Sequence, residues 1–357
     1  MLQRVLVVNP GSTSTKIAVF EGATRLFDQG LTHSAEELSA YPTIASQYEF
    51  RDRAIRAVLA ARGFDMSTLG AVVGRGGLLK PIPGGVYRVN DDMKADIEEA
   101  RYGEHASNLG ALIADGLAVE LGIPAFIADP VVVDELSDLA RVSGHKLFKR
   151  ISIFHALNQK AVARRYCAER GLRYEEATLI VAHMGGGVSV GLHRRGRVED
   201  VNQALSGEGP FSPERSGTLP AGDLARLCFS GKYSQKEVLR MISGSGGMVS
   251  FIGSNDMRDA ENGFHAGDPD ATLYFKAFIY QVGKAVGALA AAACGKVDGI
   301  ILTGGIAYGR DVVEGLTEMC SFIAPVVAYP GEGELEALAK AGYGALSGEL
   351  PILEYRR

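Results

Sequence analysis

The stretch RVLVVNPGSTSTKIAVFE, residues 4–21, decides the fold. Residues 4–8 form a short apolar run typical of a buried strand, and residues 16–21 and 24–27 favour two further strands. The turn between the first two strands, NPGSTST, combines glycine with hydroxyl side chains, so its successive backbone N–H groups can face one anion. This segment predicts a strand meander whose first turn either binds phosphate oxygens or is a plain hairpin turn of serine and glycine.

The same layout recurs in the second half of the chain. TLIVAHMGGGVSVGLH, residues 178–193, is followed by a turn at Gly196 and by RVEDV, residues 197–201. Strand, glycine-rich turn, strand, turn and strand follow one another in both places, which indicates a duplicated architecture rather than duplicated residues. A length of 357 residues also favours two domains. Helical and strand patterns alternate elsewhere, as in an α/β protein.

Composition excludes several classes of protein. Hydrophobic residues make up 46% and charged residues 22%, which is typical of a globular protein, and a net charge of −5 without a basic block argues against nucleic-acid binding. The four cysteines form no CxxC pair, which fits a reducing compartment. There is no signal-peptide core, and the small apolar run 285–295 is too short to span a bilayer, so we expect a cytoplasmic protein without a membrane partner.

Further segments carry candidate chemistry. In AHMGGG, residues 182–187, three glycines follow a strand that ends at His183, so backbone and imidazole could both reach a phosphoryl group. LTGG, residues 302–305, could hold a nucleotide in the same way, although such glycines also occur in ordinary turns. A GxxxxGK[ST] loop is absent. Arg75, Asp129 and Arg215 lie in glycine- or proline-rich loops, where charges either serve a site or are simply solvated.

Together and in this order, these segments resemble the acetate, propionate and butyrate kinase family of the actin-like ATPase superfamily. VNPGSTSTKIAVFE and VAHMGGGVSV are similar to its two phosphate segments, and ILTGGIA to its adenosine segment. NPGSTSTK, GRGGLLKPIPGG, HASNLGALIA and SIFHALNQKAVARR are closer to butyrate kinases than to acetate kinases. The resemblance implies two actin-like (ribonuclease H-like) α/β domains, with mixed sheets flanked by helices and the nucleotide in the interdomain cleft. We expect domains at 1–148, joined by the C-terminal helix 334–357, and at 149–333.

The resemblance also implies roles for individual residues. The expected catalytic residues are Arg75, His105, Asp129, His183 and Arg215. The expected nucleotide- and phosphate-binding residues are Asn9, Ser12, Ser14, Lys16, Gly185, Gly186, Gly187, Gly304 and Gly305. Asp129, Glu334 and Asn9 would serve the metal, with Glu332 as the alternative to Glu334.

The chain departs from the family pattern beside one proposed site residue. Acetate kinases carry an arginine just before a VVHGG stretch, where this chain has Val72; we expect Arg75 to take over the contact with the substrate carboxylate. Gly74 and Gly76 beside it would leave room for a longer acid, and Leu78 and Leu79 could line its pocket or pack into the sheet.

The expected activity is transfer of the γ-phosphoryl group of ATP to a short-chain carboxylate, with Mg²⁺ and with butyrate as the preferred acid. A carboxylate is ionised at neutral pH and needs no general base. The alternatives are a kinase for acetate, propionate or isobutyrate and, more remotely, an actin-like regulatory ATPase. The resemblance further implies a homodimer and a reaction that also runs from acyl phosphate and ADP towards ATP.

Overall fold

The computed structural model describes residues 4–357 and divides into two compact units. The first contains the chain up to Val133 together with Gly333–Arg357, and the second contains Asp134–Glu332. Residues 134–148, which we assigned to the first domain, therefore belong to the second unit. The two units are described separately below.

The first unit is a seven-stranded sheet with helices. Its elements are β1 (Arg4–Pro10), β2 (Ser14–Glu21), β3 (Thr24–Thr32), α1 (Ala35–Ser39), η1 (Ala45–Gln47), α2 (Tyr48–Ala61), η2 (Met66–Thr68), β4 (Leu69–Arg75), β5 (Val86–Arg88), α3 (Asp91–Glu98), α4 (Asn108–Leu121), β6 (Ala125–Ala128), α13 (Glu334–Ser347) and β12 (Ile352–Glu354). The strand order is β12-β5-β6-β4-β1-β2-β3.

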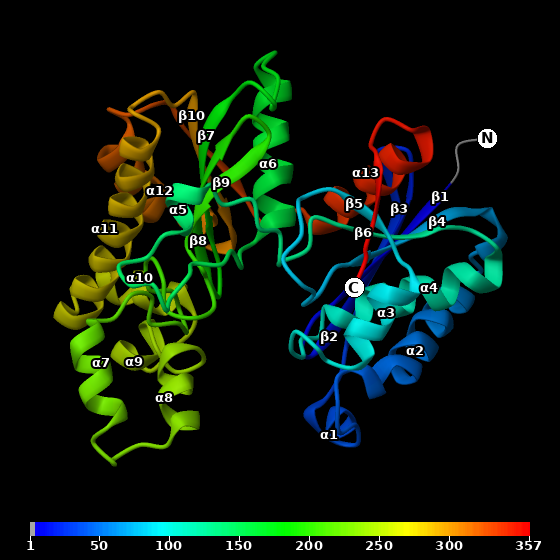
Figure 1. Cartoon of the computed structure of the whole chain (residues 1–357), viewed down its shortest axis with the longest axis horizontal. Coiled ribbons are helices and arrows are strands. Elements are labelled where there is room, and N and C mark those ends of the chain that lie inside the picture. Colours follow the sequence, from blue (N-terminus) through cyan, green and yellow to red (C-terminus); the bar gives the residue numbers. More distant parts are fainter. Residues whose placement is uncertain (1–3) are drawn as a thin grey trace. The chain divides into compact units, whose positions relative to one another are not determined.

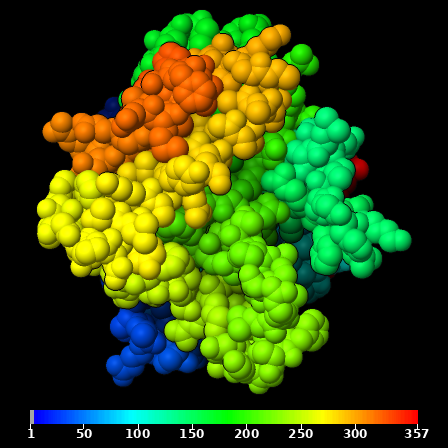
Figure 2. All heavy atoms as spheres, turned by 90° about the vertical axis from the view of Figure 1, so that its left-hand side faces the viewer, coloured from blue at the N-terminus to red at the C-terminus, as the bar shows by residue number. Residues whose placement is uncertain are grey.

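The second unit has a five-stranded sheet in the order β11-β10-β7-β8-β9. Its elements are α5 (Asp138–Arg141), α6 (Ala156–Glu169), β7 (Thr178–Met184), β8 (Val188–Arg194), β9 (Arg197–Val201), α7 (Ala221–Cys228), α8 (Gln235–Ile242), α9 (Met248–Ile252), α10 (Met257–His265), α11 (Pro269–Ala292), β10 (Gly299–Gly304), η3 (Gly305–Tyr308), α12 (Arg310–Cys320) and β11 (Val326–Pro330). Figure 2 looks onto its helical side, with α10 and α11 in yellow and α12 in orange.

Five strands of the first sheet repeat the topology of the second sheet, and Figure 1 labels the two meanders, β1 to β3 and β7 to β9. β1, β2 and β3 form an antiparallel meander, and β4 and β6 continue from β1 in parallel. β7, β8 and β9 form the corresponding meander, and β10 and β11 continue from β7 in parallel. The duplicated architecture predicted from the strand pattern is present in both units.

The apolar strands of both sheets are buried because helices cover them. Val5–Val8 of β1 and Ala71–Val73 of β4 are fully buried, and α4 packs against β4. In the second unit the long helix α11 buries Phe275, Phe278 and Val282 in the core that also holds β7, β8 and β10. Continuous burial of this kind is expected of parallel strands covered by helices.

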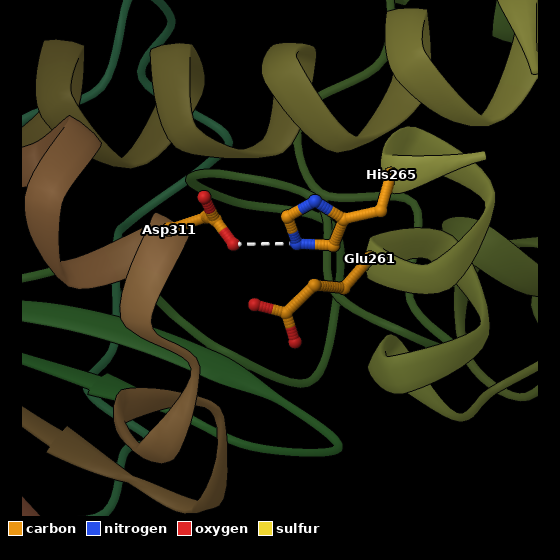
Figure 3. Close-up of side chains that lie close together, drawn as sticks. All are labelled: Glu261, His265 and Asp311. Atoms are coloured by element: carbon orange, nitrogen blue, oxygen red, sulfur yellow. Dashed lines mark hydrogen bonds and ion pairs between the residues drawn. The ribbon is translucent and has the colours of Figure 1, made fainter. Parts of the chain in front are cut away.

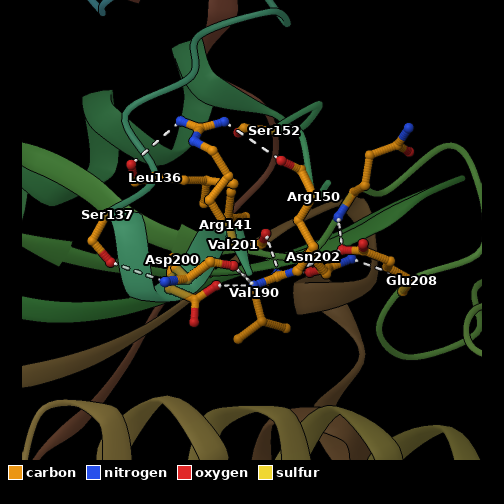
Figure 4. A network of polar contacts seen from close by, with 12 residues as sticks. Leu136, Ser137, Arg141, Arg150, Ser152, Val190, Asp200, Val201, Asn202 and Glu208 are labelled. Atoms are coloured by element: carbon orange, nitrogen blue, oxygen red, sulfur yellow. Dashed lines mark hydrogen bonds and ion pairs between the residues drawn. The ribbon is translucent and has the colours of Figure 1, made fainter. Parts of the chain in front are cut away.

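The segment before α6 is fastened to the second unit by a polar network (Figure 4). Arg150 donates to Asp200 Oδ1 at 2.9 Å and to the Val201 carbonyl oxygen at 3.0 Å, both on β9. The backbone N–H of Ser137 donates to the Glu199 carbonyl oxygen, also on β9, at 2.9 Å. These contacts explain why residues 134–148 belong with the second sheet.

Local sequence signals set several helix ends. Asn90 accepts from the Met93 N–H at the start of α3, and Asp268 accepts from the Ala271 N–H before Pro269 opens α11. Ser234 and Glu237 form the capping box of α8. Within residues 4–357, no helix combines the length and apolar character that a membrane span requires.

Candidate active site

In the first unit, three polar residues lie at the carboxyl ends of adjacent parallel strands. Val8 of β1 pairs with Gly74 of β4, so Asn9 and Arg75 follow side by side. Arg75 pairs in turn with Ala128 of β6, and Asp129 comes next. Ligands of open α/β sheets bind outside this edge of the sheet. The sheet register therefore places three of the expected site residues on neighbouring strands.

Glu334, the first residue of α13, contacts two of these residues, Asn9 and Arg75. Its Oε2 accepts from Asn9 Nδ2 at 2.7 Å, and its Oε1 lies 3.1 Å from Arg75 Nη2. Asn9 and Glu334 are 6% and 8% exposed, whereas the Arg75 side chain is 23% exposed and stays open to water. The structure brings Glu334, rather than Glu332, to Asn9 and Arg75.

Asp129 is held rigidly one strand away. It has φ 38°, in the left-handed region that non-glycine residues seldom occupy. Its backbone N–H donates to the Gly85 carbonyl oxygen at 2.9 Å, and its Oδ1 accepts from the Gly85 N–H at 2.8 Å. Such a constrained carboxylate at a strand end is typical of functional positions.

The turn between β1 and β2, which the sequence predicts as the first phosphate turn, is held by a buried arginine that the sequence analysis missed. Arg51 of α2 is completely buried. It donates to the carbonyl oxygens of Gly11, Ser12 and Ser14 at 2.8, 3.1 and 2.8 Å. With these carbonyls turned inward, Ser12 stays exposed at the surface of the turn. Lys16 is exposed on β2, opposite Asn9 in the register.

His105 lies in the loop before α4. Its Nδ1 accepts from the Ser107 N–H at 3.2 Å and lies 2.7 Å from Ser107 Oγ. The imidazole is exposed, and these bonds are local to its loop. They do not link it to the Asn9–Arg75–Glu334 cluster.

The glycines beside Arg75 serve packing. A Cβ on Gly74 would lie 2.0 Å from the Gly110 carbonyl oxygen of α4, and one on Gly76 would lie 2.5 Å from Pro130 Cβ. Leu79 is 2% exposed and belongs to the hydrophobic core of the unit. The interpretation that these glycines leave room for a longer acid, and that Leu79 lines its pocket, is therefore wrong: Gly74 is needed for close packing against α4, and Gly76 for close packing against Pro130.

In the second unit, His183 is the penultimate residue of β7 and is 2% exposed. Its ring stacks on that of His155, with centroids 3.7 Å apart and planes 9° from parallel. Its Nδ1 lies 2.7 Å from Asn158 Oδ1. Asn158 and His155, on and just before α6, are residues that the sequence analysis did not single out; only their place in SIFHALNQK, one of the family-like stretches, could have pointed to them.

Arg215 lies next to Gly187 and His155. A Cβ on Gly187 would meet Arg215 Nη1 at 1.9 Å and His155 Cε1 at 3.4 Å. Nη1 donates to the Ala204 carbonyl oxygen at 2.9 Å, whereas the buried Nε finds no hydrogen-bond partner among residues 4–357. Burial lowers the pKa of the Arg215 guanidinium. A buried cation with an unfilled donor suits an anionic ligand.

A pocket of about 690 Å³ lies beside these residues, within the range of small-molecule sites. Of the expected residues, Gly185, Gly186 and Gly305 line it, and Gly304 lies next to it at φ 87°. Its other lining residues are Pro213, Asn255, Asp256, Met257, Arg258, Glu261, Ile306, Tyr308, Gly309 and Val312. The sequence analysis missed the segment 255–261, whose only local signal is the turn GSND before α10.

Two features mark the rim of this pocket. Asp256 accepts from Arg258, which lowers the Asp256 pKa to about 2. Glu261 and His265 of α10 face Asp311 of α12, and His265 Nε2 lies 2.9 Å from Asp311 Oδ2 (Figure 3). Burial, followed by the neighbouring Asp311, raises the pKa of Glu261.

Comparison with known proteins identifies the family. Residues 142–322 match the model of the acetokinase family. The chain is 53% identical to butyrate kinase 2 of Clostridium acetobutylicum over 99% of both chains, and 52% identical to a probable butyrate kinase of Bacteroides thetaiotaomicron over 99% of this chain and all of the other.

Solved structures agree on the fold. Acetate kinase of Porphyromonas gingivalis superposes with a TM-score of 0.78 at 20% identity, covering 96% of this chain and 99% of the other. A propionate kinase of Francisella tularensis superposes with 0.72 at 17% identity, covering 95% and 98%. The expected fold class and the assignment to kinases that act on a carboxylate are confirmed. The chain belongs to the acetokinase family.

Proposed function

We propose that this chain is a butyrate kinase that transfers the γ-phosphoryl group of ATP to butyrate and catalyses the reverse reaction from butyryl phosphate and ADP. The observation that carries the proposal is the buried guanidinium of Arg215, whose Nε lacks a partner, close to the nucleotide-sized pocket lined by Gly185 and Gly186. An unfilled cationic donor beside such a pocket suits a phosphoryl group. The names of the relatives at 51–53% identity support butyrate as the acid.

The described side chains suit the separate roles that this reaction requires. Arg75 would bind the substrate carboxylate, which is already ionised and attacks the γ-phosphorus while the bond to ADP breaks. Arg215 and His183 would stabilise the negative charge on the transferring phosphoryl oxygens. The turn with Ser12, Ser14 and Lys16 would bind phosphate oxygens. Catalysis then rests on positioning and charge, without proton removal from the nucleophile.

The acidic and amide oxygens of the first unit fit a magnesium ion. Asp129 and Glu334 are nearly buried carboxylates at one sheet edge, and Asn9 contacts Glu334. Oxygen ligands of this kind, with several waters retained, are those that Mg²⁺ prefers. Asp129, Glu334 and Asn9 would hold Mg²⁺, which supplies charge neutralisation to the phosphate groups.

The homodimer that the resemblance implies and the cytoplasmic location expected from the sequence both stay proposals. Sedimentation equilibrium over a range of protein concentrations checks the first. A single species at the monomer mass throughout would contradict it. Fractionation of the producing cells checks the second.

The substrate is tested by trapping the acyl phosphate with hydroxylamine. We would supply saturating MgATP with acids of two to six carbons, branched isomers included, and compare kcat/KM. Butyrate or a branched acid of four or five carbons should give the highest value. Acetate matching butyrate would contradict the butyrate assignment, and ATP hydrolysis indifferent to every acid would contradict the kinase itself.

A further inference from the structure

Three side chains of the second unit that can bind a metal ion meet between α10 and α12 (Figure 3). Glu261 and His265 lie four residues apart on α10, so they share one face of that helix. Asp311 lies in the first turn of α12. One possible ligand atom from each of the three lies within 4.8 Å of the other two. The fold thus brings an imidazole and two carboxylates from separate helices to one place.

Helix electrostatics explain two of these residues but not the third. His265 ends α10 and Asp311 begins α12, where helix dipoles favour a cation and an anion respectively. His265 Nε2 lies 2.9 Å from Asp311 Oδ2, which completes a local pair. Glu261 lies half-buried in the middle of α10. A Cβ on Gly309, just before α12, would lie 3.3 Å from Glu261 Oε1, so this second carboxylate also faces the start of α12.

The neighbouring arginines do not neutralise the two carboxylates. Arg258 of α10 pairs with Asp256, and Arg310 of α12 pairs with Glu314. Within the three-residue cluster, His265 is the basic group, and it contacts Asp311. Two facing carboxylates with one imidazole leave negative charge that a dication would neutralise.

The donor atoms suit a transition-metal ion better than Mg²⁺. Magnesium prefers an octahedron of oxygen ligands, whereas an imidazole nitrogen with carboxylate oxygens suits Zn²⁺ and its neighbours. Bonds of about 2.0–2.2 Å place two ligands of a tetrahedral zinc ion roughly 3.3–3.6 Å apart. The separations in the cluster run from 2.9 Å, between His265 and Asp311, to at most 4.8 Å, so small side-chain movements would bring all three onto one ion. The exposed His265 gives the ion a path from solvent.

We propose that Glu261, His265 and Asp311 bind a transition-metal dication of the Zn²⁺ class, with water as the fourth ligand, and that this ion clamps α10 to α12. The metal bonds replace the hydrogen bond between His265 and Asp311. Glu261 of α10 and Val312 of α12 both line the pocket of about 690 Å³, so the ion fixes two of its walls. The effect on a nucleotide in that pocket rests on the proposed function, whereas metal binding itself does not.

The direct test is calorimetric titration of the full chain with Zn²⁺, without nucleotide, Mg²⁺ or chelator. His265→Gln and Asp311→Asn each remove a ligand and should weaken binding at this site by about a hundredfold or more, because even groups that only orient a ligand contribute about 10–100-fold. His145→Gln removes an exposed histidine from the loop after α5 and is the matched control, which should bind as wild type does. Any other zinc site on the chain appears in all four proteins alike. Isotherms of His265→Gln and wild type that coincide would overturn the proposal.

Co²⁺ in place of Zn²⁺ identifies the ligands. The difference spectrum between wild type and Asp311→Asn should show visible d–d absorption without the near-ultraviolet charge-transfer band of a thiolate. Cys228 and Cys294 are exposed thiols, so this band is the sign of a competing site. A thiolate band in that difference spectrum would assign the ion elsewhere and contradict the proposal.

Stability reports the clamp. Because a ligand that binds only the folded state stabilises it, Zn²⁺ should raise the melting temperature of wild type and of His145→Gln but not of His265→Gln. If the variants failed to fold, diffraction at the zinc edge from wild-type crystals grown with Zn²⁺ would decide. An anomalous peak between the three side chains would support the site, and a peak only elsewhere would overturn it.

Binding of AMP tests the link to the pocket. Zinc neutralises a carboxylate on the pocket wall, so wild type should bind this anion at least about fivefold more tightly with Zn²⁺ than without, whereas His265→Gln should show no such gain. Equal affinities in wild type would contradict the clamp at the pocket. Failure of AMP to bind under any condition would count against the proposed function, while the zinc titration, which contains no nucleotide, would be unaffected.

Discussion

Arg51 Nη2 lies 3.1 Å from the carbonyl oxygen of Ser12, at the centre of the first phosphate turn. The other partners of this buried guanidinium are also neutral: the carbonyls of Gly11 and Ser14, Thr15 Oγ1 and Gln47 Oε1. Thr15 Oγ1 lies in turn 2.9 Å from His33 Nε2. Burial and the nearby Arg51 lower the pKa of His33, which keeps that ring neutral.

Replacing Arg51 should therefore damage the turn and its ligand binding together. Arg51→Met removes this donor from the part-buried carbonyls of Gly11 and Ser12, at about 1–3 kcal/mol each, whereas the Ser14 carbonyl keeps the Gly11 N–H. We expect a lower melting temperature and a raised KM for MgATP. Arg62→Met, an exposed arginine that follows the same helix, is the matched control and should change neither. An unchanged KM in a destabilised Arg51→Met would show that the turn does not depend on this arginine.

Arg215→Ala should lower kcat by roughly a thousandfold or more, the scale of transition-state arginines in other phosphoryl transfers. Among the described residues, its guanidinium has one hydrogen bond, to the Ala204 carbonyl oxygen, and an Nε without a partner, so the fold should lose little. Turnover and a melting curve would be measured on the same preparation. Turnover within tenfold of wild type would remove Arg215 from the catalytic residues.

Substitutions of His183 should separate its two nitrogens. His183→Ala should lose most activity. Glutamine can place an NH₂ group near the position of Nε2, whereas asparagine reaches only as far as Nδ1, so His183→Gln should retain more kcat than His183→Asn. Rates for all three, with melting curves, check this order. Equal loss in Gln and Ala variants of intact fold would contradict a role through hydrogen bonding.

Leu79 allows core packing to be separated from substrate choice. Since it is buried in the core, Leu79→Ala should destabilise the protein by about 2–5 kcal/mol. The ratio of kcat/KM for butyrate over acetate should stay as in wild type, at tenfold or more. Two methylenes buried at about 0.8 kcal/mol each supply that much. A large fall of this ratio in Leu79→Ala would show that Leu79 lines the pocket for the acid.

Glu261 should make stability depend on pH. Its pKa is raised in the folded protein, so the folded state binds its proton more tightly than the unfolded state does. That contribution is complete below the unfolded pKa and is lost as pH rises through the folded pKa. Glu261→Gln should therefore raise the melting temperature at pH 7.5 and leave it nearly unchanged at pH 4. An equal shift at both values would exclude a charge effect.

Much of the fold was predictable because its signals are local. The apolar runs at residues 4–8 and 178–183, with glycine-rich turns after them, predicted both meanders, and Asn90, Ser234 and Asp268 marked helix starts through their own side chains. The expected site residues also follow from motifs, since a strand end with glycine or a loop charge is visible in the residue order.

Tertiary structure decided what depends on neighbours distant in sequence. Sheet register sets Asn9, Arg75 and Asp129 side by side, and α13 returns Glu334 to them across some 325 residues. Arg51 lies in no motif, because its role comes from backbone carbonyls that only the folded chain presents. The glycines around Arg75 were interpreted as room for substrate, but α4 occupies the space beside Gly74 and Pro130 the space beside Gly76. Sequence by itself determined the strand pattern and the chemical groups; long-range packing decided which groups meet and in which protonation state.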